Sequence, residues 1–148
     1  SIDLHGQKDM FESLRYTVHL LDDHPSATIC VFPQGALQPW SIRPLRYKRG
    51  VEWILSEIDK PVNVLPFAIR AELLEQQRPE VFFMFGDSYT VKNGRFEGVE
   101  WLEGKETKLL DTLKSRIHSG DKGSIILQGS RSIHERYTSF TNRITGDT

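Results

Sequence analysis

The sequence predicts an α/β protein in which a mixed, mostly parallel central sheet is flanked by helices. Short apolar runs typical of buried strands alternate with stretches whose apolar residues recur every three or four positions, as on one face of a helix. The first two runs are separated by a connection of about thirty residues that includes a helical stretch, which is the spacing of a strand–helix–strand unit. No repeat or low-complexity tract divides the chain, so we expect a single α/β domain over residues 1–148.

Four apolar runs are the predicted strands. They are residues 28–32, 62–69, 81–85 and 125–127. Continuous apolar runs are typical of strands buried on both faces, so we expect Val31 and Phe83 to lie in the core. The single cysteine, Cys30, is expected to pack there too. One cysteine cannot form an intramolecular disulfide, which fits reducing, cytoplasmic surroundings.

The helical stretches follow from apolar stripes. Phe11, Leu14, Val18 and Leu21 form the first stripe, residues 51–58 carry the second, and residues 109–117 and 133–144 carry two more. Residues 89–104 contain Asn93-Gly94, a turn signal, and are expected to form a small hairpin or a loop over the sheet.

The turn after the first predicted strand is the clearest candidate for a binding site. Phe32-Pro33-Gln34-Gly35 stops the apolar run, since Pro33 lacks an N–H and Gly35 permits a positive φ or a close backbone approach. A dense basic segment follows, containing Arg43, Arg46, Lys48 and Arg49. This combination predicts an anion site, while the alternative interpretation of the basic residues is a solvated helix start.

The same residues carry a family resemblance. Phe32-Pro33-Gln34-Gly35, Tyr47-Lys48-Arg49-Gly50 and the apolar run at residues 62–70 resemble, in order and spacing, the glycerolipid and lysophospholipid acyltransferases. In that family a Phe-Pro-Glu-Gly-Thr-Arg-Ser loop binds the acceptor, a Phe-Lys-x-Gly step opens the next helix, and a Val-Pro-Val-type strand follows. The resemblance covers roughly residues 1–90 and implies a glycerol-3-phosphate acyltransferase-like fold.

Two departures from the family pattern bear on activity. The family's His-x-x-x-x-Asp pair is absent, because His5 and Asp9 are one position too close and follow the first recognisable block, Ser1-Ile2-Asp3. We therefore expect the catalytic part to be missing from an N-terminally truncated chain. In the acceptor loop the family Glu is Gln34, and Ala36-Leu37-Gln38 replaces Thr-Arg-Ser.

The resemblance implies an acyltransferase that moves a fatty acyl group from acyl-CoA or acyl carrier protein to a hydroxyl of a lysophospholipid, glycerol phosphate or related lipid alcohol. The implied substrate-binding residues are Phe32, Pro33, Gln34, Gly35, Arg43, Lys48 and Arg49. No cofactor or metal is implied, and the expected partners are the acyl donor and the lipid acceptor, with peripheral contact to the cytoplasmic face of a membrane through residues outside this chain. The alternative is a non-enzymatic lipid- or anion-binding module derived from the same fold.

Composition excludes several other classes. The 19 Lys and Arg residues are balanced by 20 Asp and Glu residues, so no overall positive charge draws the protein to nucleic acid. No apolar run approaches the ~18 residues of a transmembrane helix.

His19 and His24 lack partners at metal-ligand spacing, and Gly129-Ser130-Arg131-Ser132 lacks the second glycine of a nucleophile elbow. Trp40 is expected either to line an acyl or sugar pocket or to cover the end of the sheet.

Overall fold

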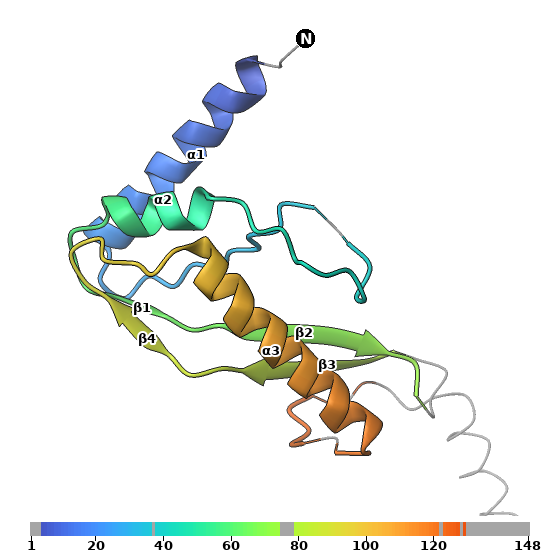
Figure 1. Cartoon of the computed structure of the whole chain (residues 1–148). Helices are drawn as coiled ribbons and strands as arrows, with labels where there is room; N and C mark the ends of the chain where they lie inside the picture. The colour runs from blue at the N-terminus through green and yellow to red at the C-terminus, as the bar shows by residue number, and fades with distance from the viewer. Residues whose placement is uncertain (1–3, 37, 75–78, 122, 128, 130–148) are drawn as a thin grey trace, which may run out of the picture. The chain divides into compact units, whose positions relative to one another are not determined.

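A computed structural model describes residues 4–36, 38–74, 79–121, 123–127 and 129 of the chain (Figure 1). These residues contain three helices and four short strands. They belong to two units, one drawn from residues 1–67 and 85–109 and the other from residues 68–84 and 110–148. None of the helices in the described part of the chain combines the length and the apolar character needed to cross a bilayer.

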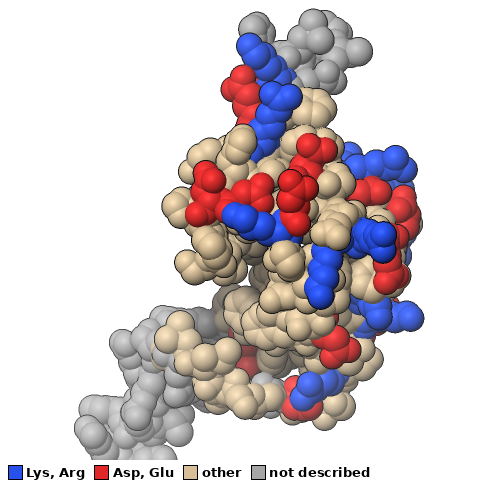
Figure 2. Space-filling view, turned by 90° about the vertical axis from the view of Figure 1, so that its left-hand side faces the viewer, with Lys and Arg blue, Asp and Glu red and all other residues tan. Residues whose placement is uncertain are grey.

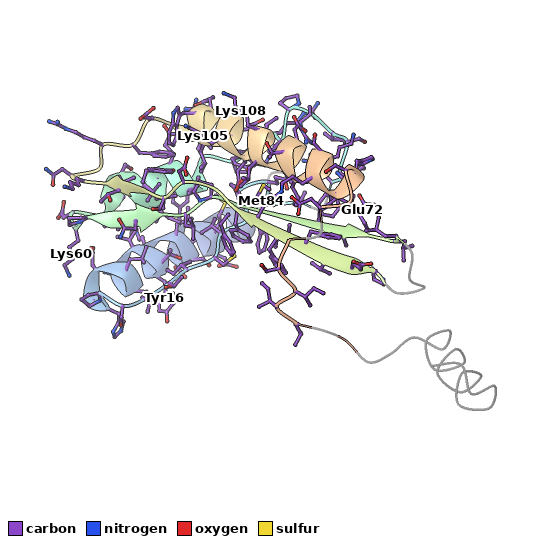
Figure 3. The ribbon with its side chains drawn as sticks, turned by 90° about the horizontal axis from the view of Figure 1, so that it is seen from below. Tyr16, Lys60, Glu72, Met84, Lys105 and Lys108 are labelled. Carbon is purple, nitrogen blue, oxygen red and sulfur yellow. The ribbon has the colours of Figure 1, made fainter. Side chains whose placement is uncertain are left out.

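Two helices pack against each other in the first unit (Figure 1). Helix α1 spans Leu4–Asp23 and helix α2 spans Gly50–Glu57, which confirms the first two predicted helices. Val18 of α1 and Ile54 of α2 form a small core with Ile58, the residue directly after α2. Tyr16 lies on the outer side of α1 and is exposed (Figure 3). Burial of the stripe, rather than helix propensity alone, therefore stabilises these helices.

The first unit also contains an antiparallel strand pair. Strand β1 (Val62–Val64) pairs with β4 (Tyr89–Val91), and Val62 lies opposite Val91. The chain then turns at Asn93 and Gly94, whose φ angles are 52° and 63°. Two successive positive φ angles are typical of the turns preferred in hairpins, as the Asn-Gly signal indicates. Helix α3 (Val99–His118) starts soon afterwards, ten residues before the predicted stripe at residue 109.

The second unit contains most of a second strand pair and the end of α3. Strand β2 (Phe67–Glu72) pairs with β3 (Glu80–Phe85), and Leu113 and Ile117 of α3 are buried. Figure 3 labels Glu72, whose carboxylate accepts a hydrogen bond from Arg70 on the same strand, and Met84 on β3. Alternate β3 residues are exposed and half-buried, as in a sheet with one covered face.

The prediction of a mostly parallel central sheet is wrong. The described residues form two sheets of two strands, in the orders β1–β4 and β2–β3, and the strands of each pair run antiparallel. Residues 73–79 connect β2 to β3, and this link is too short for a parallel crossover, which needs about a dozen residues or more. The antiparallel arrangement thus follows from the length of the connection.

Two of the four predicted strands do not form. Residues 28–32 have no ladder partner among the described residues, and residues 125–127 likewise form no strand and are highly exposed. The predicted strand at residues 62–69 becomes parts of β1 and β2, separated at Leu65 and Pro66. Pro66 has no N–H to donate to a ladder, which accounts for the break. The helix predicted at residues 133–144 lies outside the described residues.

The predicted burial of the first and third runs is also wrong. Cys30 is exposed. The relative solvent-accessible surface is 38% for Val31 and 51% for Phe83. A continuous apolar run is buried on both faces only when elements cover both faces, as in parallel sheets. The two-stranded sheets of this protein do not provide that environment.

Candidate anion-binding site

The turn and the basic segment predicted from the sequence are joined by main-chain hydrogen bonds. The N–H of Gly35 donates to the carbonyl of Phe32 at 3.2 Å and closes the turn, and Gly35 has a φ of 66°. The N–H of Lys48 donates to the carbonyl of Pro33 at 2.7 Å. The structure therefore brings together two of the segments that carry the family resemblance. We call residues 32–35 the turn and residues 43–49 the basic loop.

The cations of the basic loop differ in their surroundings. Arg43 Nη1 donates to the carbonyls of Trp40 at 3.0 Å and Ile42 at 2.9 Å, so its guanidinium folds back on the preceding loop. Arg49 Nη2 lies 3.9 Å from Glu100 Oε1, and both side chains are more than three-quarters exposed. Lys48 is exposed and Gln34 is half-buried. Three predicted cations therefore lie on one surface-exposed loop.

Trp40 precedes this loop and is itself exposed. Its carbonyl accepts a hydrogen bond from the Arg43 guanidinium. Through this contact, the main chain of Trp40 helps to orient a cation of the basic loop.

A glutamate from α3 holds the basic loop by its main chain. The N–H of Arg46 donates to Glu103 Oε1 and the N–H of Tyr47 donates to Oε2, both at 3.1 Å. Arg46 has a φ of 58°, in the left-handed region that residues other than glycine rarely adopt. Successive N–H groups turned to one side in this way form a concave anion-binding site. Here that site is occupied by the protein's own carboxylate.

A second glutamate, Glu106, lies one turn further along α3. Its Oε1 accepts a hydrogen bond from the N–H of Phe67 at 3.3 Å. Its Oε2 is buried and has no hydrogen-bond partner among the described residues. Burial raises the pKa of Glu106 from its ordinary 4.5 to about 7, although the Phe67 N–H opposes the shift. Glu106 therefore changes its charge near neutral pH.

The charge of Glu106 contributes to raised pKa values at two tyrosines. Burial, followed by the charges of Glu106 and Glu103, raises the pKa of Tyr47, whereas the charge of Arg43 opposes the shift. Burial and then Glu106 and Glu97 raise the pKa of Tyr89 to about 12. Both phenols therefore stay uncharged at physiological pH.

Tyr89 is embedded among aromatic side chains. Its ring meets Trp101 edge to face with centroids 4.8 Å apart, and Phe96 stacks on it at 6.5 Å. Lys105, labelled in Figure 3, places Nζ 5.2 Å from the centroid of the Trp101 ring. This packing fixes the start of α3 and hence the helix that carries Glu103.

Sequence reasoning missed both glutamates. The basic loop and Glu103 are separated by more than fifty positions, and spacing along a chain does not reveal such a contact. Glu106 leaves a clearer signal, since it falls at a helical interval between Leu102 and Leu109 on the stripe that includes Leu113. A carboxylate at an apolar stripe position indicates partial burial and a shifted pKa.

Aromatic rings lie beside the turn. Phe32, which is 69% exposed, meets Phe67 with ring centroids 6.5 Å apart, and Phe67 meets Phe85 at 6.2 Å. The exposed rings of Phe32 and Phe85 give the neighbourhood of the turn an apolar surface, adjoining a loop that carries cations. Such a combination suits a ligand that has both an anionic group and an apolar part.

Figure 2 shows that basic and acidic side chains are interspersed on the face in view. The arrangement accords with the balanced composition, so attraction of an anion depends on the local loop.

Comparisons with models of protein families, with curated proteins and with solved structures found no match to this chain.

Proposed function

We propose that this chain supplies the acceptor-binding part of an acyltransferase. The reaction moves a fatty acyl group from acyl-CoA or acyl carrier protein to a hydroxyl of a lysophospholipid, glycerol phosphate or related lipid alcohol, in the cytoplasm or at the cytoplasmic face of a membrane. The acceptor hydroxyl attacks the thioester carbonyl, the thiolate leaves, and a general base takes the hydroxyl proton. The proposal rests on the residues of the turn and the basic loop rather than on the fold class.

The observation that carries the proposal is the hydrogen bond between Lys48 and Pro33. It joins the Phe-Pro-Gln-Gly turn to the Tyr-Lys-Arg-Gly segment, the two blocks that resemble the acceptor site of the acyltransferases. In this arrangement Gln34 and Gly35 contact the acceptor, and the cations of the basic loop bind its anionic group. Phe32 offers an exposed ring to the apolar part of the ligand.

Calorimetric titration with glycerol 3-phosphate tests the proposal. We expect binding to the natural chain and a roughly tenfold or greater loss for the variant that removes the cation contacting the phosphate, since a charged hydrogen bond contributes about 1.5–3 kcal/mol. Arg43→Ala, Lys48→Ala and Arg49→Ala are compared for this purpose. Lys92→Ala, at the exposed turn after β4, is the matched control. Natural affinity in all three folded loop variants would refute a role for the cations.

The alternative is a lipid- or anion-binding module without catalytic activity. It is favoured by the absence of a His-x-x-x-x-Asp pair from the sequence and by the neutral Gln34. We expect this chain by itself to release no free CoA from a long-chain acyl-CoA in the presence of lysophosphatidic acid. Turnover at ordinary enzyme rates that is lost in His5→Ala would contradict this expectation and make His5 the candidate base.

A further inference from the structure

Glu103 is the residue through which α3 fixes the basic loop. Its carboxylate accepts both the Arg46 and Tyr47 N–H groups, and each donor–acceptor distance is 3.1 Å. Leu45, directly before this pair, and Leu102, directly before Glu103, are both buried. A buried leucine therefore precedes each partner of the contact, one in the loop and one in the helix.

The contact with Glu103 supports a backbone conformation that is otherwise unfavourable. Arg46 has a φ of 58°, and the left-handed region costs a residue with a Cβ roughly 1–2 kcal/mol. Two hydrogen bonds to an ionised acceptor are sufficient to offset that cost. Without them, we expect the loop to relax toward negative φ at residue 46.

The influence of this contact extends to the turn. Tyr47 is followed directly by Lys48, whose N–H binds the carbonyl of Pro33. A change of φ at Arg46 would redirect this hydrogen bond and displace the cations on either side of it. The position of the basic loop against the turn therefore depends on the side chain of Glu103.

We infer that Glu103 is a positioning residue for the anion site: although it is negatively charged, it makes anion binding possible by fixing the main chain of the basic loop. This inference rests on the proposed function for the identity of the ligand. It makes a prediction opposite in sign to simple electrostatics, in which removal of a negative charge beside cations tightens anion binding.

Glu100 provides a matched control. It lies one turn before Glu103 on α3, and its carboxylate is 3.9 Å from the Arg49 guanidinium, with both groups largely exposed. Glu100→Gln removes the same charge from the neighbourhood of the loop. We expect this variant to bind glycerol 3-phosphate as tightly as the natural chain, or slightly more tightly.

The expected result for Glu103→Ala is a loss of glycerol 3-phosphate affinity of about five- to thirtyfold by calorimetry. Glu103→Gln retains one acceptor oxygen, so its affinity for glycerol 3-phosphate should lie between that of the natural chain and that of the alanine variant. Thermal unfolding of each variant establishes that it is folded at the temperature of the titration. Unchanged or tighter binding by folded Glu103→Ala and Glu103→Gln would overturn the inference.

Arg46→Gly tests whether Glu103 affects anion binding through the backbone conformation of residue 46. Glycine adopts positive φ without the steric cost, so loss of Glu103 should weaken binding less in the Arg46→Gly background than in the natural one. Equal losses in the two backgrounds would show that Glu103 does not act through the conformation of residue 46.

Amide hydrogen exchange without ligand separates this inference from the proposed function. Glu103→Ala should accelerate exchange at the amides of Arg46 and Tyr47, whereas Glu100→Gln should leave them unchanged. If the natural chain fails to bind glycerol 3-phosphate while these amides respond as expected, the phosphate assignment fails and the positioning role stands. Unaltered exchange in Glu103→Ala would overturn the positioning role itself.

Discussion

At the scale of single residues, the sequence identifies the exposed members of the candidate site but not the groups that hold them. Gly35 and the cations of the basic loop are recognisable because turn chemistry and charge are local properties. Glu103 acts on the loop from a helix far along the chain. Its partners are main-chain N–H groups, which every residue except proline has, so no pattern of side chains marks the contact.

The raised pKa of Glu106 predicts a specific pH dependence of stability. The folded protein holds the Glu106 proton up to about pH 7, whereas the unfolded chain releases it near 4.5. The free energy of unfolding should therefore fall as pH rises through this window and level off above it. The full shift corresponds to at most about 3 kcal/mol, which screening at this partly exposed carboxyl reduces to about 1–2 kcal/mol.

Glu106→Gln should remove this loss of stability. Glutamine keeps an acceptor for the Phe67 N–H without the ionisation, so urea unfolding at pH 5 and pH 8 should differ less in this variant than in the natural protein. Glu12→Gln, at an exposed position of α1, is the matched control. A pH dependence in Glu106→Gln equal to that of the natural chain would exclude Glu106 as its source.

At the scale of elements, the first two helices and the second half of α3 were predictable. The start of α3, in residues expected to form a hairpin or loop, and the pairing of the strands were not. The stripes of α1 and α2 are local patterns, and the structure buries Val18 and Ile54 from them in a common core. A strand needs a partner from elsewhere in the chain, and the run at residues 28–32 has none among the described residues. The short link between β2 and β3 was visible in the sequence and should have indicated an antiparallel pair.

Two matched valine-to-alanine substitutions test whether Val91 is buried and Val31 is exposed, as the structure shows. Val91 on β4 is buried at 4% exposure and lies opposite Val62. Val91→Ala should lower the free energy of unfolding by about 2–3 kcal/mol, since it removes buried methyl groups and leaves a cavity. Val31→Ala, in the exposed run, should cost less than about 1 kcal/mol.

Urea unfolding measures both valine changes in the same assay. A cost for Val31→Ala that equals or exceeds that of Val91→Ala would restore the original expectation that residues 28–32 form a buried strand.

At the scale of the whole molecule, the numbers of acidic and basic residues are nearly equal. The formal net charge is −1, and the face in Figure 2 mixes acidic with basic groups. Exposed charges further apart than about 10 Å are screened at 0.1 M salt. Capture of an anionic ligand therefore depends on the few cations of the basic loop and not on a long-range field.

This local attraction predicts a limited salt dependence. Raising the ionic strength from about 0.05 to 0.5 M should weaken glycerol 3-phosphate binding by a few-fold to about tenfold, because only nearby exposed cations contribute. A monoacylglycerol, which has the hydroxyl and the acyl chain but no phosphate, should bind with nearly the same affinity at both salt concentrations. Calorimetry with each ligand makes the comparison. Parallel weakening of both ligands would mean that salt acts on the fold, while a salt-independent phosphate ester would mean that the basic loop does not bind the phosphate.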